Sequence, residues 1–178
     1  WITMSMNVRE ADAVVIGGGP AGMMAAVTAA ERGRRVLLLE HEKFCGKKLR
    51  ITGKGRCNVT NRSDVKAFLK EVCSNPKFLY SCLNRFSPED AMAFFEESGV
   101  PLKTERGNRV FPVSDRAHDV ANALERRMKR AGVCVKEAEA LEVLTRDGAA
   151  AGVKTPEGNL SCGSVLIATG GVTYPLTG

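Results

Sequence analysis

The chain has 178 residues, 44% hydrophobic and 26% charged, which suits one globular domain with a substantial core and excludes a disordered chain. Its formal charge is +6, and no stretch approaches the roughly 18 uninterrupted apolar residues of a membrane-spanning helix. The excess charge is local, because residues 43–56 hold six basic residues and no acid, whereas the rest of the chain holds 20 of each sign. The role of this basic stretch is the main question that the composition raises.

The six cysteines are scattered, without a C-x-x-C motif or metal-ligand spacing, and the chain has only two histidines. We therefore expect reduced thiols and no bound metal. The beginning of the chain lacks the pattern of an export signal, which favours a cytoplasmic protein. Residues 1–10 are interpreted as a tail and residues 11–178 as one domain. Because the sequence stops just after an apolar strand, we expect it to be the first part of a longer chain.

The first predicted elements form a strand–helix–strand unit. Residues 13–16 are an apolar run typical of a strand buried on both faces, glycines gather at 17–22, and residues 23–32 have a helix pattern. Residues 35–39 are the next strand, and Glu40 ends it. This order indicates a βαβ unit with two parallel strands.

The rest of the chain predicts a long loop followed by helices and strands. Residues 43–62 contain glycines without a clear period, so we expect an ordered loop of a length that is usually functional. The predicted helices are 65–73, 75–86, 88–98 and 115–130, and the predicted strands are a hairpin over 102–113 and strands at 133–137, 140–145, 151–154 and 160–168. The sequence thus predicts an α/β fold with a central parallel sheet, helices and a small antiparallel β-meander.

The glycine cluster matches the dinucleotide-binding pattern G-x-G-x-x-G at Gly17, Gly19 and Gly22. Such glycines permit a tight turn, the approach of a pyrophosphate and close packing of the helix, whose free N–H groups hold the phosphates. Glu40 lies 18 residues after Gly22 and is placed to accept hydrogen bonds from ribose hydroxyls, which argues against NADP at this site. The other candidate binding residues of this turn are Gly18, Pro20 and Ala21.

A second candidate motif lies near the end of the chain. Residues 166–171 read LIATGG, an apolar strand ending in Ala-Thr-Gly, which resembles the second FAD motif of flavoproteins with two dinucleotide-binding domains. Alone, this junction could belong to any strand that runs into a turn. Together with the first motif it favours FAD over NAD and adds Thr169 and Gly170 as candidate cofactor contacts.

The basic stretch resembles the signature of a known family. Residues 46–61 read GKKLRITGKGRCNVTN, residues 109–114 read RVFPVS, and residues 168–171 read ATGG. These segments closely resemble signatures of the YhiN/BaiN-like flavoproteins, a family of NAD(P)/FAD-dependent oxidoreductases that includes 3-dehydro-bile-acid reductases. The resemblance covers residues 11–178. One departure is Asn108, at a turn position where the family pattern leads us to expect glycine.

The resemblance implies a Rossmann-like, GR-type FAD-binding domain whose family members are longer than this chain. It implies that the ADP half of FAD contacts the first glycine turn and Glu40, and that the loop of residues 46–61 runs past the pyrophosphate and ribityl chain toward the flavin. A diphosphate needs positive charge and N–H donors, which this loop can supply, so we expect Lys48 and Arg56 to point inward. The remaining candidates in this loop are Gly53, Gly55, Cys57 and Asn58.

Three further side chains have less specific roles. Cys57 is interpreted as a small structural thiol beside the cofactor rather than a nucleophile. His41 is a candidate contact to the adenosine, with an exposed loop histidine as the alternative. Leu141 begins a strand at which related flavoproteins hold adenine through backbone atoms.

The sequence therefore predicts an FAD-dependent oxidoreductase: NAD(P)H reduces the flavin, which passes hydride to an electron-poor, enone-like small molecule. No catalytic acid or base is specific enough to name, and the oligomeric state is not predicted. A tRNA-modifying flavoprotein is one alternative, and would show basic residues spread over a face and interleaved with aromatics. The neutral remainder and the 6% aromatic content favour no nucleic-acid and no membrane partner. A truncated FAD-binding fragment without activity is the other alternative.

Overall fold

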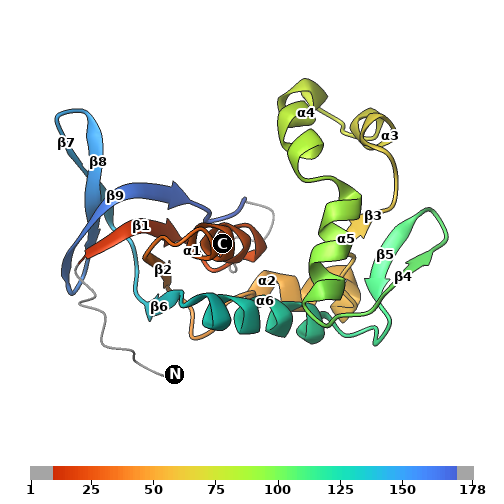
Figure 1. Ribbon diagram of the computed structural model, residues 1–178, viewed down its shortest axis with the longest axis horizontal. Helices are drawn as coiled ribbons and strands as arrows, with labels where there is room; N and C mark the ends of the chain where they lie inside the picture. Colours follow the sequence, from red (N-terminus) through yellow and green to blue (C-terminus); the bar gives the residue numbers. More distant parts are fainter. Residues whose placement is uncertain (1–9, 172–178) are drawn as a thin grey trace. The chain divides into compact units, whose positions relative to one another are not determined.

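The structure is a computed structural model that describes residues 10–171 (Figure 1). The chain divides into two compact units. We call residues 1–48 with 124–178 the sheet unit, and residues 49–123 the inserted unit. No helix in the described range is long and apolar enough to cross a membrane.

The sheet unit is built on a six-stranded sheet with the strand order β6-β2-β1-β9-β8-β7. Four strands are parallel, with β1 between β2 and β9, and β2 next to β6. The meander β7–β8–β9 is antiparallel. The elements are β1 (Glu10–Ile16), α1 (Pro20–Glu31), β2 (Val36–Glu40), β6 (Cys134–Glu137), β7 (Glu142–Arg146), β8 (Ala149–Thr155) and β9 (Gly158–Ile167). The predicted βαβ unit and antiparallel meander are both confirmed.

Burial explains the parallel arrangement of the central strands. Every residue of β2 is buried, as expected for a strand covered on both faces. Val14, Leu37, Val153 and Leu160 form one apolar cluster within this unit.

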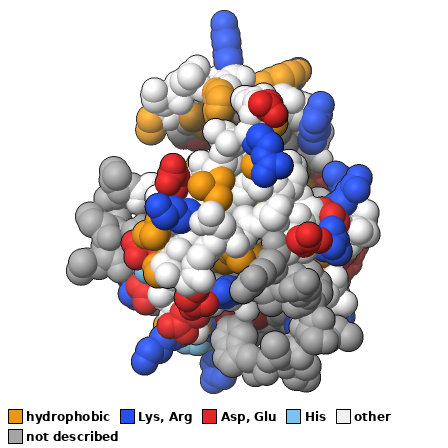
Figure 2. All heavy atoms as spheres, turned by 90° about the vertical axis from the view of Figure 1, so that its left-hand side faces the viewer, with side chains coloured by type: hydrophobic (Ala, Val, Ile, Leu, Met, Phe, Trp, Pro, Cys, Tyr) orange, Lys and Arg blue, Asp and Glu red, His pale blue; other side chains and the backbone are white. Residues whose placement is uncertain are grey.

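On the surface turned toward the viewer in Figure 2, basic and acidic side chains are interspersed.

The inserted unit combines helices with a three-stranded antiparallel sheet of order β3-β5-β4. Its core contains Cys57, Val100, Ala117 and Val120. The elements are β3 (Thr60–Asn61), α3 (Val65–Lys70), α4 (Pro76–Arg85), α5 (Pro88–Glu97), β4 (Leu102–Glu105), β5 (Arg109–Pro112) and the first half of α6 (Ala117–Ala131). Helix α5 begins with a capping box between Ser87 and Asp90, at the predicted start.

Two details differ from the sequence expectations. The predicted irregular loop at 43–62 contains the helix α2 (Lys47–Ile51), the 3-10 turn η1 (Thr52–Gly55) and β3. These elements are too short to show a hydrophobic period. At the β4–β5 turn, Asn108 occupies the left-handed region with φ 59°, which asparagine tolerates better than most residues, so the departure from glycine is accommodated.

Candidate functional site

The glycine turn between β1 and α1 is packed against backbone on two sides. Gly17 has φ +103°, and a Cβ there would lie 2.5 Å from the carbonyl oxygen of Ala168, just after β9. A Cβ on Gly22 would lie 1.9 Å from the carbonyl oxygen of Gly17. These two positions therefore require glycine because the helix, the turn and the end of β9 approach one another more closely than a side chain allows.

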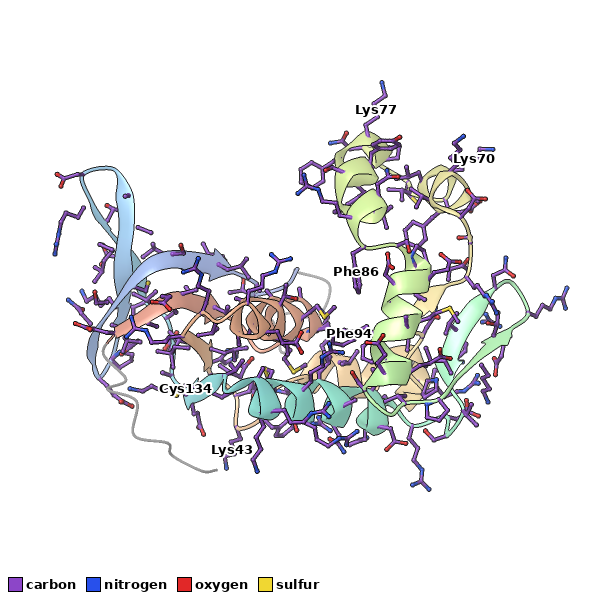
Figure 3. The ribbon with its side chains drawn as sticks, in the orientation of Figure 1. Lys43, Lys70, Lys77, Phe86, Phe94 and Cys134 are labelled. Carbon is purple, nitrogen blue, oxygen red and sulfur yellow. The ribbon has the colours of Figure 1, made fainter. Side chains whose placement is uncertain are left out.

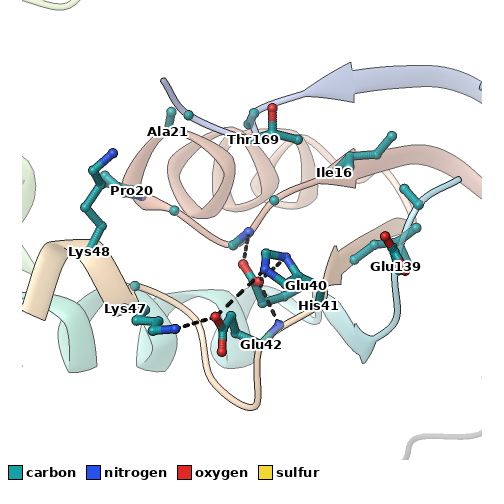
Figure 4. A pocket seen from close by; sticks show the side chains of 18 of the residues that line it. Ile16, Pro20, Ala21, Glu40, His41, Glu42, Lys47, Lys48, Glu139 and Thr169 are labelled. Carbon is teal, nitrogen blue, oxygen red and sulfur yellow. Dashed lines mark hydrogen bonds and ion pairs between the residues drawn. The ribbon is translucent and has the colours of Figure 1, made fainter. Parts of the chain in front are cut away.

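Glu40 lies beneath this turn, and its carboxylate is oriented by the backbone (Figure 4). Its Oε2 accepts a hydrogen bond from the N–H of Gly18 at 2.6 Å, and its Oε1 accepts one from the N–H of Glu42 at 2.9 Å. The Nδ1 atom of His41 lies 3.2 Å from the same Oε1, and the Glu40 side chain is only 11% exposed. Two backbone donors thus hold the carboxylate at the wall of the pocket before any ligand arrives.

The start of α1 faces open space. Gly19 is the N-cap, with φ −71° and ψ 177°, and no side chain caps the helix. The first turn contains no acidic residue, and a Cβ on Gly19 would meet nothing within 4 Å. The first N–H groups of the helix and its positive dipole end are therefore available to an anion.

These features border a cavity of about 720 Å³, a size typical of ligand sites. Lys48 lies at the end where α1 begins, and its Nζ is 3.5 Å from the carbonyl oxygen of Gly171 (Figure 4). Lys47 instead forms an ion pair with Glu42 and holds the pKa of that carboxyl below its usual value. The cavity therefore combines an anion-binding end at α1 and Lys48 with a hydroxyl-accepting carboxylate at Glu40.

Most of the candidate residues of the sheet unit line this cavity. They are Gly17, Gly18, Gly19, Pro20, Ala21, Glu40, His41, Lys48, Thr169 and Gly170. Gly22 is buried in α1. Leu141 is 52% exposed, and its N–H already donates to the carbonyl oxygen of Lys154 at 2.8 Å.

Sequence reasoning missed the wall formed by Ala138, Glu139 and Ala140. This segment follows β6, which pairs with β2, and the N–H of Ala138 donates to the carbonyl oxygen of Glu40 at 2.9 Å. The carboxyl ends of parallel strands meet at one sheet edge, so the signal was the end of the third parallel strand.

The other candidates, Gly53, Gly55, Arg56, Cys57 and Asn58, lie in the inserted unit. Gly53, Lys54, Gly55 and Cys57 all have positive φ, so this segment has an unusual backbone. The amide of Asn58, with its NH₂ group turned toward the hairpin, donates to the carbonyl oxygens of Thr60 and Val110. Asn58 therefore contributes to the shape of the segment.

Arg56 is engaged within the inserted unit. Its guanidinium donates to Glu105 at 2.5 Å and to Asp115 at 2.6 Å, and lies 4.2 Å from the ring centroid of Phe111. Lys103 donates to Asp115 at 2.7 Å. The hydrogen bonds from Arg56 lower the pKa of Glu105, and those from Lys103 and Arg56 lower the pKa of Asp115. This cation is thus matched by two carboxylates of its own unit.

Cys57 is 1% exposed, and burial raises the pKa of its thiol to about 11. At neutral pH the thiol is therefore protonated, which does not suit a nucleophile. Among the described residues, no group of histidine, cysteine or carboxylate side chains could hold a metal ion.

Comparison with known proteins decides the family. Residues 11–178 match the HI0933-like protein Rossmann domain. The chain belongs to this family. The family assignment based on the three signatures and the predicted α/β Rossmann-type fold are therefore confirmed.

Two curated relatives match this HI0933-like chain over most of its length. The 3-dehydro-bile acid delta(4,6)-reductase of Clostridium scindens is 31% identical over 160 residues, 88% of this chain and 38% of the relative. The ribosomal RNA dihydrouridine synthase of Escherichia coli is 30% identical over 165 residues, 92% of this chain and 40% of the relative. The chain thus spans about two fifths of the length of these relatives.

Solved structures share the fold of this HI0933-like domain. The 3-ketosteroid-delta4-(5alpha)-dehydrogenase of Rhodococcus jostii RHA1 has a TM-score of 0.70 and 18% identity, over 94% of this chain and 47% of that one. A flavocytochrome c3 fumarate reductase has a TM-score of 0.72 and 20% identity, over 92% of this chain and 34% of that one. At these identities the likeness concerns the fold alone.

Proposed function

We propose that the protein is an FAD-dependent oxidoreductase that reduces a carbon–carbon double bond conjugated to a carbonyl group. The observation that carries the proposal is the polarity of the cavity. One end offers the open N-terminus of α1 and Lys48, and another offers the oriented carboxylate of Glu40. A dinucleotide requires this combination, because its pyrophosphate is anionic and its ribose hydroxyls are donors.

The chemical groups that line the cavity match those that FAD requires. The backbone N–H groups of Gly19 and Ala21 would hold the pyrophosphate together with Lys48, and a phosphate beside Gly19 would meet no side chain. Glu40 would accept the ribose hydroxyls. The remaining proposed cofactor contacts of the sheet unit are Gly17, Gly18, Pro20, Gly22, His41, Leu141, Thr169 and Gly170.

FAD held in this cavity would supply the chemistry of hydride transfer from NAD(P)H to the substrate. The described residues of this chain would bind and orient it: the glycine turn leaves the phosphate position clear of side chains, and the N–H groups of Gly18 and Glu42 orient the carboxylate of Glu40. We assign the catalytic acid to no residue.

The substrate class follows from the chemistry that the relatives share. One relative is a delta(4,6)-reductase of a 3-dehydro, and hence 3-oxo, bile acid. Dihydrouridine, the product named for two others, is uridine in which a double bond conjugated to a ring carbonyl is saturated. Both reactions add hydride to an electron-poor double bond. A small enone is our first candidate, and a uracil base in RNA is the second, favoured by the two dihydrouridine synthase relatives.

Cofactor binding is tested by incubating the purified protein with FAD, removing free flavin by gel filtration and recording the visible flavin absorption. We expect retained flavin in the wild type. The variant Gly19→Ala adds a Cβ where the protein has open space, so it should fold normally and bind FAD at least about tenfold more weakly. The matched control is Gly163→Ala, whose Cβ makes an ordinary 3.6 Å contact with the carbonyl oxygen of Asp12. Wild-type protein without flavin, or equal affinity in Gly19→Ala, would contradict the proposed site.

The reaction class is tested anaerobically. NADH or NADPH should bleach the flavin, and adding a 3-oxo-Δ4 steroid should restore the absorption and yield the saturated ketone. Recovery with uridine-containing RNA and formation of dihydrouridine would favour the second candidate. Bleaching without reoxidation by either substrate would reject the conjugated double bond as the target.

A further inference from the structure

Helices α3 and α4 of the inserted unit carry exposed aromatic side chains. Neither helix buries a residue. The side chains of Phe78 and Tyr80 are 79% and 59% exposed, and Phe86, directly after α4, is 42% exposed. Exposed aromatic side chains gathered on one surface are typical of a binding site.

The same segment carries a net positive charge. Residues 62–86 contain five basic and two acidic residues, a net charge of +3. Among the residues that the structure describes, none of the five forms an ion pair; they are Arg62, Lys66, Lys70, Lys77 and Arg85. Lys70 and Lys77 extend away from their helices (Figure 3). In the basic stretch of residues 43–56, by contrast, Lys47 and Arg56 are paired with carboxylates.

Cations and aromatics occur together on the exposed side of α4. Leu79 and Leu83 are half-buried, and α4 packs against α3. Around the rest of the helix, Lys77 precedes Tyr80 by three residues, and Arg85 follows Phe78 by seven, so each aromatic shares a face with a cation. This is the interleaved pattern expected of a surface that contacts both phosphates and bases.

We propose that this α3–α4 surface binds single-stranded RNA. The cations contact phosphates, and unpaired bases stack on Phe78 and Tyr80. The charge argues against a second copy of the same surface as the partner, because five unpaired cations would face five others. The whole-chain aromatic content obscured this arrangement, since four of the ten aromatic residues lie within residues 62–86. The proposal does not depend on the flavin chemistry, because it concerns a different surface.

The test measures fluorescence anisotropy of a fluorescein-labelled oligouridylate with the FAD-saturated protein at several salt concentrations. Removing both stacking rings in Phe78→Ala/Tyr80→Ala should weaken binding at least about tenfold and leave the salt dependence unchanged. Lys70→Ala/Lys77→Ala should weaken binding and reduce the slope of log K against log salt by about 1.4. The exchange Phe78→Tyr/Tyr80→Phe keeps both rings and should retain wild-type affinity.

The matched control is Lys129→Ala/Arg130→Ala, which removes the same charge from the exposed end of α6. It should bind the oligonucleotide as the wild type does. Equal affinity in wild type and Phe78→Ala/Tyr80→Ala would reduce the interaction to diffuse charge and overturn the proposal. So would a wild type that binds no oligouridylate, or one that elutes as a dimer which the double alanine variant converts to a monomer.

Discussion

The two glycine-rich segments, residues 17–22 and residues 53–55, differ in how closely they are packed. In the first segment, a Cβ on Gly22 would lie 1.9 Å from the carbonyl oxygen of Gly17, whereas in the second segment a Cβ on Gly55 would meet nothing within 4 Å. Gly55 is instead in the left-handed region, with φ +83°. The first segment is therefore shaped by close packing of backbone on backbone. At Gly55 the second is shaped by backbone conformation, in space that a side chain could enter, although a Cβ on Gly53 would lie 2.9 Å from the backbone N of Asn58.

The two segments also differ in what holds them in place. The first connects strand β1 to helix α1, and the N–H of Gly18 within it donates to the carboxylate of Glu40. The second precedes Arg56, whose guanidinium joins it to Glu105 and Asp115. Packing does not depend on pH or salt, but half-exposed ion pairs do. The packing of the first segment should therefore be insensitive to salt, and the ion pairs of the second should respond to it.

The strongest test of the packed segment is Gly22→Ala. Its Cβ would overlap the backbone of the turn, so we expect the free energy of unfolding to fall by about 3 kcal/mol and flavin retention to be lost. Urea denaturation followed by circular dichroism measures this effect. Gly163→Ala, with only an ordinary contact, should unfold like the wild type. If the two variants were equally stable, the turn would be able to relax and the contrast between the segments would disappear.

The second segment should respond to backbone conformation rather than to volume. Gly55→Ala places a Cβ in open space at a left-handed position and should destabilise the protein by about 1–2 kcal/mol. Gly55→Asn adds more atoms but tolerates this conformation better, so it should cost less than alanine. The same denaturation experiment applies. A larger loss for asparagine than for alanine would show that space, not φ, limits this position.

The ion pairs of Arg56 should contribute less than either glycine. Arg56→Ala removes the link to Glu105 and Asp115 and the contact with Phe111, and we expect Tm to fall by roughly 2–4 °C. Arg56→Lys should restore only part of this, because lysine lacks the planar fork. The control Arg146→Ala removes an arginine that forms no ion pair among residues 10–171 and should leave Tm unchanged. A similar shift in both variants would assign the effect to net charge.

The difference between the segments also explains what the sequence could predict. The turn of residues 17–22 and Glu40 were predicted because the motif is local and follows a strand of at least four apolar residues. The strands of the sheet were predicted for the same reason. The partners of Arg56 could not be predicted, since Glu105 and Asp115 lie 49 and 59 residues away in sequence. The short helix α2 and the left-handed Cys57 have no periodic or compositional signal.

The smallest expected effect is the pH dependence of the Arg56 contribution. The pKa values of Glu105 and Asp115 are lowered in the folded protein. Their contribution to stability is therefore complete above the unfolded-state pKa values of about 4, and it is lost as the pH falls through the lower folded-state values. The difference in Tm between wild type and Arg56→Ala should therefore be constant from about pH 7 to pH 5 and shrink below about pH 4. Thermal melts across this range measure it. A difference that persisted under acidic conditions would assign the contribution of Arg56 to its contact with Phe111, and the second segment would then also be held by packing.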